Sequence, residues 1–332
     1  MKALFIGGTG IISSACSQQT VERGIDLTIF NRGQTTQRPV PDGARSIRGD
    51  IRDPDAARRA LAGQTFDVVA DFVAFTPEQV QLDVDLFRGR TGQYIFISSA
   101  SAYQKPLAGL PITESTPLAN PYWAYSRAKI ACEDLLVKAY RDDGFPITIV
   151  RPSHTYDRTM LPVDGGYAVI DRMRRGKKVV IHGDGTSLWV LTHHQDLARA
   201  FVGLLGNPHA IGESFHITSD ELLTWNQIYD LLARAAGVAL CPVHVPSDGI
   251  AAYDRAWGDG LLGDKAHSVI FDNTKIKRAV PGWVATIPFA QGAREIMAWH
   301  DADPSRQAVD PATDALFDQI IAAYEAAWPA AR

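Results

Sequence analysis

The chain opens with "MKALFIGGTGIISSACSQQTVERG" (residues 1–24), which predicts a strand, a glycine turn and a helix. The apolar run 3–6 is typical of a buried strand, and 12–23 has helical spacing. Gly7 and Gly10 fit a G-x-x-G-x-x-G turn, and Ser13 stands at the third glycine position. In such turns only the third glycine serves close helix packing, while the first two serve the turn and phosphate approach. The stretch therefore still favours a nucleotide site.

Short apolar segments alternate with helical segments through the first half of the chain. The predicted strands are 3–6, 27–30, 46–48, 68–73, 94–98 and 147–150, and the predicted helices are 12–23, 54–62, 77–89 and 125–141. Continuous apolar strands that alternate with helices indicate a parallel sheet covered on both faces. We therefore predict an α/β fold with a doubly wound parallel sheet of the Rossmann type. Its ligand crevice is expected at the carboxyl ends of the strands.

The pattern loosens after residue 151, where longer loops separate the helical segments. Those segments are 167–174, 195–205, 225–236, 288–300 and a tail helix at 314–327. We predict an NAD(P)-binding domain over residues 1–160, with its sheet completed by part of 188–220. Residues 161–332 are expected to form a smaller α+β substrate lobe.

Composition limits the classes of function. A net charge of −4 argues against a nucleic-acid binder that works by bulk electrostatics, and the basic run 172–178 is expected to be a solvated helix end. Three distant cysteines, Cys16, Cys132 and Cys241, are typical of reduced thiols in a cytoplasmic protein. The chain enters a strand at once, leaving no room for a signal peptide, and lacks an apolar run of roughly 20 residues. A membrane span is therefore not predicted. No segment has the spacing of metal ligands, so a metal is not predicted either.

The ends of the second and third strands bear on the choice of cofactor. An acidic residue usually meets the NAD ribose at the end of the second strand, but this chain has Asn31 and Arg32. A neutral side chain followed by a guanidinium can clamp a 2′-phosphate, which favours NADP over NAD; the alternative is that Arg32 is a solvated loop residue. Asp50 follows the third strand, where it can accept from an adenine amino group or cap the helix near Pro54.

The sharpest chemical signal lies in "ISSASAY" (97–103) and "YWAYSRAK" (122–129). Tyr125 and Lys129 are four residues apart and share one helix face. A lysine ammonium, with an oxidised nicotinamide nearby, is expected to move the pKa of the phenol down toward the working range. Ser99, at a strand end, can hold the substrate oxygen. The set predicts proton transfer at a hydroxyl or carbonyl, coupled to hydride transfer.

Five segments in order, "GGTGIIS", "GDIRD", "SSASAY", "YSRAK" and "RPSHTYD" (151–157), resemble the extended short-chain dehydrogenases/reductases, which include sugar epimerases and dehydratases. The resemblance implies catalytic roles for Ser99, Tyr125 and Lys129, with Lys129 also holding the nicotinamide ribose. It also implies a homodimer through helices 77–89 and 125–140. The cofactor-binding positions expected from the residues and the resemblance are Gly7, Thr9, Gly10, Ile11, Ile12, Asn31, Arg32, Asp50, Ile51, Phe72, Ala74, Tyr125, Lys129, Pro152 and His154.

The chain departs from the pattern of nucleotide-sugar members in two places. Those members carry an arginine after G-D-G, where "GDGTSLWVLTHHQDLARA" (183–200) has Trp189. A guanidinium there would pair with a diphosphate, so its absence favours a smaller, less charged substrate or a different way of holding phosphate. "DFVAFTP" (71–77) replaces the usual H-x-A-A and puts Phe75 beside the nicotinamide region. No glutamate follows Ser99, so dehydration ranks below reduction and epimerisation.

The substrate side is less defined. The segment 256–272 is predicted to be either a lid carrying Asp264, Lys265 and His267 into the site or an exposed connection. His193 and His194 adjoin in a strand, so one is expected to face the pocket, although a structural histidine is the favoured interpretation for either; Asp196 fits an N-cap. The candidate substrate residues are Phe75, Ser101, Tyr103, Trp189, His193, Lys265 and His267.

The sequence therefore predicts an NAD(P)-dependent oxidoreductase or epimerase that transfers a hydride at a secondary hydroxyl or ketone of a carbohydrate-like substrate. One alternative is a simple NADPH-dependent ketone reductase. Another is an RNA-binding protein that reuses the fold, because the C-terminal half resembles bacterial epimerase-like proteins and the chloroplast stem-loop-binding proteins. Retention of Ser99, Tyr125 and Lys129 argues against a pure scaffold.

Overall fold

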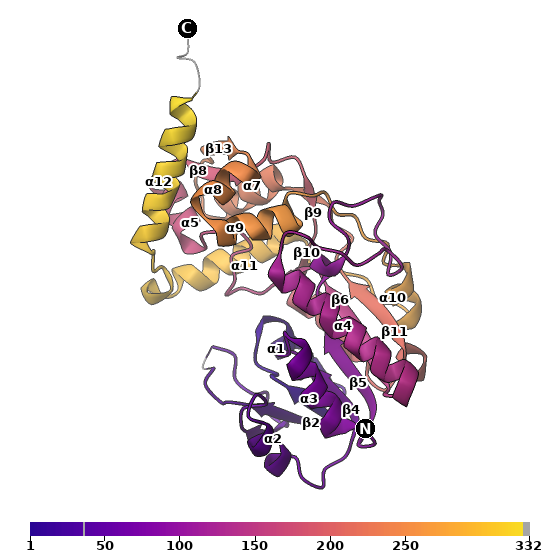
Figure 1. Ribbon diagram of the computed structural model, residues 1–332. Helices are drawn as coiled ribbons and strands as arrows, with labels where there is room; N and C mark the ends of the chain where they lie inside the picture. The colour runs from indigo at the N-terminus through magenta and orange to yellow at the C-terminus, as the bar shows by residue number, and fades with distance from the viewer. Residues whose placement is uncertain (36, 328–332) are drawn as a thin grey trace.

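The computed structural model describes residues 1–35 and 37–327, which contain a central seven-stranded sheet (Figure 1). All neighbouring strands of the sheet run parallel, in the order β11-β6-β5-β4-β1-β2-β3. The strands are β1 (Lys2–Ile6), β2 (Asp26–Asn31), β3 (Arg45–Arg48), β4 (Phe66–Asp71), β5 (Thr91–Ile97), β6 (Ile147–Pro152) and β11 (Glu213–Ile217). The sheet order changes direction on either side of β1, which creates a ligand crevice at the carboxyl ends of the strands.

Helices cover both faces of the sheet, as predicted. They are α1 (Ile11–Glu22) and α6 (His194–Leu204) on one face, and α2 (Pro54–Ala60), α3 (Pro77–Phe87) and α4 (Ala124–Asp143) on the other. Alternate residues of β1 divide between the two layers: Ala3 and Phe5 pack with α1 and α6, and Leu4 and Ile6 pack with α3 and α4. Burial on both faces explains why the strands are continuously apolar.

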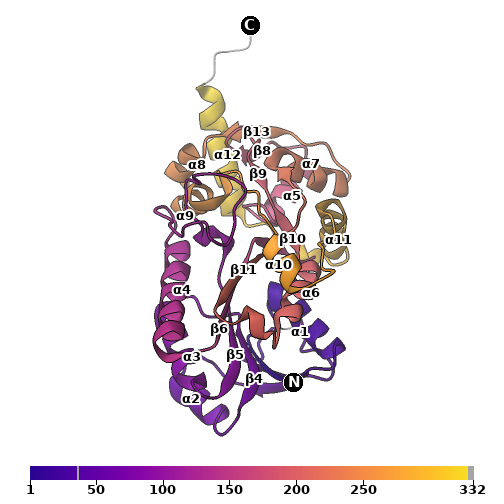
Figure 2. The ribbon, with the colours of Figure 1, turned by 90° about the vertical axis from the view of Figure 1, so that its right-hand side faces the viewer.

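The second half of the chain forms a lobe beyond the carboxyl ends of the strands (Figures 1 and 2). Its helices are α5 (Tyr167–Arg174), α7 (Trp225–Ala235), α8 (Ser247–Tyr253), α9 (Arg255–Gly260), α11 (Phe289–Asp301) and α12 (Pro311–Ala326), and α10 (Thr274–Ala279) lies near β11. Three strand pairs complete it: β7 (His154–Tyr156) with β10 (Leu191–His193), β8 (Val179–His182) with β13 (Pro242–Val245), and β9 (Leu188–Trp189) with β12 (Leu223–Thr224). Short helical turns are η1 (Ala100–Ala102), η2 (Pro208–Ala210), η3 (Leu261–Lys265) and η4 (Pro304–Arg306).

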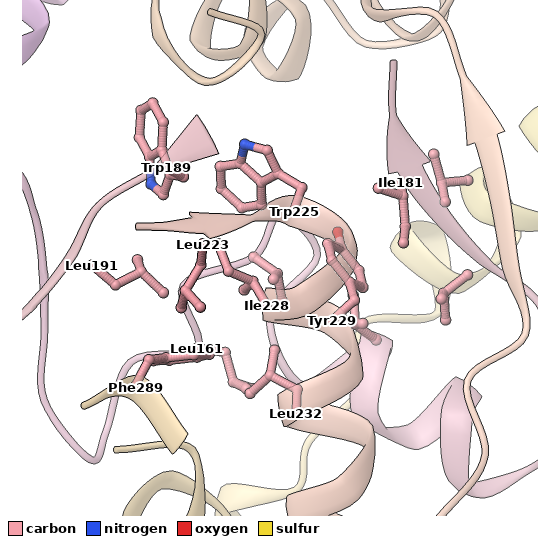
Figure 3. Packing of buried hydrophobic residues seen from close by; sticks show 14 of the residues in the cluster. Leu161, Ile181, Trp189, Leu191, Leu223, Trp225, Ile228, Tyr229, Leu232 and Phe289 are labelled. Atoms are coloured by element: carbon pink, nitrogen blue, oxygen red, sulfur yellow. The ribbon is translucent and has the colours of Figure 1, made fainter. Parts of the chain in front are cut away.

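The lobe has its own apolar core (Figure 3), in which Trp189 of β9 lies beside Trp225 at the start of α7. Their ring centroids are 5.3 Å apart. Farther along α7, Ile228 and Leu232 face Phe289 of α11 and extend the same core. Trp189 is therefore held by packing within the lobe, at the end that faces the sheet.

Most predicted elements occur within a few residues of their predicted ends, and β11 comes from the segment 188–220 that was expected to complete the sheet. The division at residue 160 stays a prediction. The helix caps exclude the capping alternative for Asp50 and differ from the cap predicted at Asp196. Asp53, rather than Asp50, caps α2 by accepting from Ala56 N, and His193, rather than Asp196, is the N-cap of α6.

The basic run 172–178 is a docking site for α12 and differs from the solvated helix end that was expected. Arg172 is only 1% exposed and pairs with Asp314 and Asp318 of α12. Lys177 also pairs with Asp318, at 2.8 Å, and Lys178 pairs with Glu325 at 2.5 Å. The positive charges of the run are thus balanced within the fold. Among the described helices, none is long and apolar enough to cross a membrane.

Candidate active site

The glycine turn between β1 and α1 lines a cavity of about 230 Å³, called here the glycine cavity. The predicted cofactor-binding residues that line it are Gly7, Thr9, Gly10, Asn31, Arg32, Asp50, Ile51 and Phe72. By helix geometry, the first N–H groups of α1 have no acceptor within the helix, and the N-terminal end of the dipole favours an anion. The cavity therefore combines phosphate donors with polar strand ends, as a dinucleotide requires.

The backbone of the turn fits a closely approaching cofactor. Gly7 and Gly8 have positive φ angles of 105° and 79°. A Cβ at Gly7 would lie 2.9 Å from Val73 Cγ1, and one at Gly8 would lie 2.7 Å from Ile29 Cγ2. Only glycine is accommodated at these two positions, and the absence of side chains leaves the backbone open to phosphate.

Ser13 has a structural task at the position of the missing third glycine. Its side chain is buried, and its Oγ accepts a hydrogen bond from Gly10 N at 2.8 Å. The serine thereby closes the turn on itself at the start of α1. The altered glycine pattern is accommodated without loss of the turn.

Arg32 extends from the end of β2 into the lining of the glycine cavity. Its carbonyl accepts from Arg48 Nε at 3.2 Å, but its guanidinium makes no hydrogen bond or ion pair with residues 1–35 or 37–327. Asn31 Oδ1 accepts from Gly33 N and shapes the same turn. Farther along, Arg38 pairs with Asp157 at 2.7 Å, which ties the segment after β2 to the residues that follow β7.

A second cavity of about 510 Å³, called here the tyrosine cavity, adjoins the first at Phe72, which lines both. The other predicted site residues that line it are Ile12, Phe75, Ser99, Ser101, Tyr125, Lys129, Pro152, His154, Trp189 and Lys265. The structure therefore brings the strand end after β5, the first turns of α4 and the substrate lobe around one space.

Lys129 is held by backbone oxygens at the base of this cavity. Its Nζ donates to Ala74 O at 2.7 Å and to Ile97 O at 2.8 Å, and it lies 6.0 Å from the centroid of the Tyr125 ring. Burial lowers the pKa of Lys129 to about 8, against the opposing charge of Asp71. The ammonium is thus fixed in place near Tyr125.

Tyr125 lies in an environment that differs from the expected one. Burial raises the pKa of its phenol above the usual value, a hydrogen bond with Ser99 lowers it, and the charge of Asp264 raises it. The predicted lowering of this pKa by Lys129 together with an oxidised nicotinamide stays a prediction. The Ser99 hydroxyl is itself oriented by Ser101, whose Oγ lies 2.9 Å away, and Ser126 Oγ donates to Ser101.

His154 and Trp189 form a pair on the lobe side of the tyrosine cavity. Trp189 Nε1 donates to His154 Nδ1 at 3.1 Å. Burial, followed by the charge of Lys265, lowers the pKa of His154 to about 3, so the ring is neutral at neutral pH. His154 was predicted to be a cofactor residue, and its position in the cavity also gives it access to substrate.

The segment 256–272 is helical as far as Lys265 and continues as an irregular connection along the cavity. It contains most of α9 and the π-helical turn η3, which brings Asp264 and Lys265 into the cavity lining. Single π-helical turns are rare and frequently occur at functional sites. Asp264 pairs with Lys105, whose side chain is fully buried, at 3.3 Å, and Lys265 pairs with Asp164 at 3.4 Å.

Three predicted substrate residues lie outside the tyrosine cavity. Tyr103 is buried beneath it, where its hydroxyl lies 3.0 Å from His216 Nδ1. His193 lines a separate open groove beside α1 and α11, and its Nε2 lies 3.1 Å from Glu295 Oε2. His267 Nε2 lies 2.9 Å from Leu262 O and does not line the cavity. The structure does not bring these three side chains into the lining of the tyrosine cavity, and their contact with substrate stays a prediction.

Two predicted cofactor residues, Ile11 and Ala74, line neither cavity, and the backbone oxygen of each accepts a hydrogen bond from a side chain near the site. Ile11 O accepts from His194 Nδ1 at 3.2 Å, and Ala74 O accepts from Lys129 Nζ. The tyrosine cavity also has lining residues that were not predicted, among them Trp123, Thr155, Met160, Val269 and Phe271. Trp123 could have been predicted, because it lies two residues before Tyr125 in the sequence. Val269 and Phe271 are not part of any motif that would have predicted them.

A family model described as the NAD dependent epimerase/dehydratase family matches residues 3–218. The chain belongs to this family. It is an NAD(P)-dependent enzyme of the extended short-chain dehydrogenase/reductase type. The residues matched include the glycine turn, Ser99, Tyr125, Lys129 and the β11 strand that completes the sheet.

Curated relatives in the family differ in what they do. The chain is 27% identical to 2′-dehydrokanamycin reductase from Streptomyces kanamyceticus, covering 85% of this chain and 80% of the relative. It is 28% identical to the chloroplast stem-loop binding protein of 41 kDa b from Arabidopsis thaliana, covering 71% of this chain and 63% of that protein. It is also 32% identical to UDP-glucose 4-epimerase from Lactobacillus helveticus, covering 46% of this chain and about half (51%) of the epimerase.

Solved structures share the fold along almost the whole chain. An epimerase from Methanothermobacter thermautotrophicus aligns with a TM-score of 0.76 at 16% identity, covering 92% of this chain and 94% of that one. UDP-glucose 4-epimerase from Thermotoga maritima, solved with UDP-glucose, aligns with a TM-score of 0.73 at 21% identity, covering 91% and 99%. Within the described residues, no cluster of side chains suits a metal ion.

Proposed function

We propose that this enzyme interconverts a secondary alcohol and a ketone on a small, carbohydrate-like substrate without a diphosphate, using NADP in preference to NAD. The observation that carries the proposal is the joint lining of one cavity by Ser99, Tyr125 and Lys129, next to a glycine turn open to phosphate. When bound, a nicotinamide cofactor supplies the acceptor or donor of a hydride.

The chain's own residues supply proton transfer and orientation. The Tyr125 phenol, protonated at neutral pH because its pKa is raised, is suited to donate a proton to a carbonyl oxygen during reduction. During alcohol oxidation the phenolate accepts that proton. Ser99, oriented by Ser101, holds the same oxygen. Lys129 is positioned to hold the nicotinamide ribose and to stabilise the phenolate.

The preference for NADP is supported by Arg32. Its guanidinium has no partner among the described residues, and it lines the glycine cavity where the adenosine ribose is expected. A 2′-phosphate can accept two charge-assisted hydrogen bonds from such a group. Asp50 also lines this cavity and can accept from the adenine amino group.

The absence of a diphosphate is supported by the charges of the tyrosine cavity. Trp189 stands where an arginine would pair with a diphosphate, and the lining charges Asp264 and Lys265 are each paired with an opposite charge. A reductase is favoured over an epimerase, because 2′-dehydrokanamycin reductase is 27% identical over 80% of its length, whereas the UDP-glucose 4-epimerase is matched over about half (51%) of its length. The UDP-glucose epimerase relative keeps epimerisation as the second candidate.

RNA binding, suggested by the relation to a stem-loop binding protein, receives no support from the basic run, since α12 neutralises it. The homodimer through α3 and α4 stays a prediction from the resemblance, and light scattering after size exclusion tests it. A cytoplasmic location stays a prediction from the sparse cysteines.

A cofactor and substrate titration tests the proposed function. NADP should bind at least about tenfold more tightly than NAD, as measured by calorimetry. A panel containing 2′-dehydrokanamycin with NADPH, and UDP-glucose with NAD, should give turnover with the former type of substrate. Absence of binding by either nucleotide would overturn the proposed function, and turnover with UDP-glucose would replace a reductase with an epimerase.

A further inference from the structure

The pair formed by His154 and Trp189 fixes the protonation pattern of a ring that lines the tyrosine cavity. Trp189 Nε1 is a donor only, so His154 Nδ1, 3.1 Å away, has to be the acceptor. In a neutral imidazole the other nitrogen, Nε2, then carries the proton. Within residues 1–35 and 37–327 the His154 ring is hydrogen-bonded through Nδ1 alone, and Nε2 has no protein partner. One donor thus remains for something outside the protein.

Packing makes this arrangement firm. Trp189 is 4% exposed and stacks beside Trp225, with the ring centroids 5.3 Å apart (Figure 3). Trp225 Nε1 in turn donates to Lys265 O at 3.1 Å, within the π-helical turn that lines the same cavity. The indole of Trp189 therefore cannot turn away from His154 without disturbing the core of the lobe.

The surrounding charges favour an uncharged substrate group next to His154. Lys265, the charged group that acts on His154, faces Asp164, and Asp264 faces Lys105. His154 itself stays uncharged over the neutral range because burial disfavours the imidazolium. On this side of the cavity a diphosphate would meet one neutral N–H and two charges that already have partners.

We propose that His154, locked by Trp189 as the Nε2–H tautomer, is a specificity-determining donor that binds an uncharged oxygen of the substrate, such as a hydroxyl, carbonyl or ring ether. This role replaces the diphosphate contact that an arginine at position 189 would make. It deepens the proposed function and rests on it. Trp189 acts through His154 and is a positioning residue, whereas His154 touches the substrate.

Nitrogen NMR of ¹⁵N-histidine-labelled enzyme tests the tautomer without any substrate. The signal of His154, assigned through its loss in His154→Gln, should report a protonated Nε2 and a bare Nδ1, unchanged between pH 5 and 8. Trp189→Phe keeps the ring and removes the donor, so both signals should move toward a mixture of tautomers. Trp283→Phe, which removes a buried indole donor bonded to Asp196 O, should leave them unchanged.

A titration with UDP-glucose tests the ligand class on the same samples in the presence of NADP. The wild-type enzyme should show no saturable heat up to about 1 mM. A protonated Nδ1, titration of His154 near pH 6, or micromolar binding of UDP-glucose would each overturn the inference. Binding of NADP separates the two proposals: if NADP binds while one of these results appears, only the inference fails, and if neither NADP nor NAD binds, the proposed function fails.

Discussion

Asp264 brings a carboxylate toward Tyr125 from a segment more than 130 residues away in the chain. Its charge raises the pKa of the phenol, and its Oδ1 lies 3.3 Å from Lys105 Nζ. At the scale of single residues, the acid–base behaviour of Tyr125 is therefore set by three neighbouring influences: burial, the Ser99 hydrogen bond and Asp264.

Replacing Asp264 should move the pH dependence of alcohol oxidation. Oxidation needs the phenolate, so its rate rises with pH through the pKa of Tyr125. Asp264→Asn removes a charge that raises this pKa, and the rising limb should shift to lower pH. The profile of kcat/KM against pH measures the shift. Asp259→Asn, in α9 and paired with Arg255, is the matched control, and an unmoved or upward-shifted limb in Asp264→Asn contradicts the account.

The cofactor preference also depends on one side chain. Arg32→Ala should weaken NADP binding by about tenfold and leave NAD binding almost unchanged, because only the 2′-phosphate loses charge-assisted bonds. Calorimetric titration with both nucleotides measures the ratio. Arg58→Ala, on the exposed surface of α2, should change neither affinity. Equal weakening of both nucleotides would show that Arg32 acts on the fold of the turn instead.

The success of sequence reasoning at this scale depended on whether a residue's task is local. Gly7, Gly10, Tyr125 and Lys129 act through turn or helix spacing, which the sequence displays directly. Strand alternation predicts that His193 lies on one face of its strand. It does not predict whether that face lines the tyrosine cavity or the open groove beside α1 and α11.

At the scale of elements, the two ends of the substrate lobe are joined by charge. α5 and the turn after it present basic side chains to the acidic face of α12, and Arg172 lies at the centre of this contact. Its guanidinium also donates to Lys178 O, so it links the helix to the following strand β8.

Removing Arg172 should loosen α12. Arg172→Met keeps much of the apolar stem but leaves Asp314 and Asp318 without their buried partner, and the free energy of unfolding should fall by about 2 kcal/mol. Urea unfolding followed by circular dichroism measures the change. Arg234→Ala, which removes an exposed pair with Asp230 within α7, should cost less than about 1 kcal/mol. Equal effects of the two variants would remove Arg172 from the docking of α12.

Regular elements were predictable because their periods are short and their termini carry marks such as Pro54, Pro77 and Gly144. The π-helical turn η3 was not predictable, since the segment 256–272 has the Gly-rich composition of a loop. Its helical form depends on tertiary contacts, among them Asn120 Nδ2 donating to Gly263 O at 2.7 Å.

At the scale of the whole molecule, several histidines are buried in the neutral form. Burial lowers the pKa of His154 to about 3, and of His182 and His194 to about 4. An unfolded chain binds protons at these rings below about pH 6.5, whereas the folded protein does not. Between pH 6.5 and 4 the unfolded state therefore binds more protons, and stability falls as the pH falls.

Urea unfolding at pH 7.0 and 5.0 should show this loss, with a decrease of a few kcal/mol in the free energy of unfolding, on the order of 1 kcal/mol per histidine per pH unit. His194→Gln removes one of the three groups and should reduce the difference between the two pH values. A protein equally stable at both pH values contradicts the neutral burial of these rings.

The fold class could be predicted because alternating apolar strands and helices admit few arrangements. The shape of the tyrosine cavity could not be predicted, because the substrate lobe closes it with residues such as Met160, Val269 and Phe271, which become neighbours only after folding. The sequence therefore predicts the residues that the sheet and α4 contribute to the site, but it does not predict how the substrate lobe is arranged around the substrate.

The most direct test of the central claim is turnover by Tyr125→Phe, which removes only the phenol oxygen from the cavity. The variant should bind NADP within about twofold of the wild-type affinity and lose at least about 100-fold in hydride transfer, followed by absorbance of NADPH with the ketone that the wild type reduces. Turnover unchanged in Tyr125→Phe would contradict the account, because proton transfer to the substrate oxygen would then come from another group.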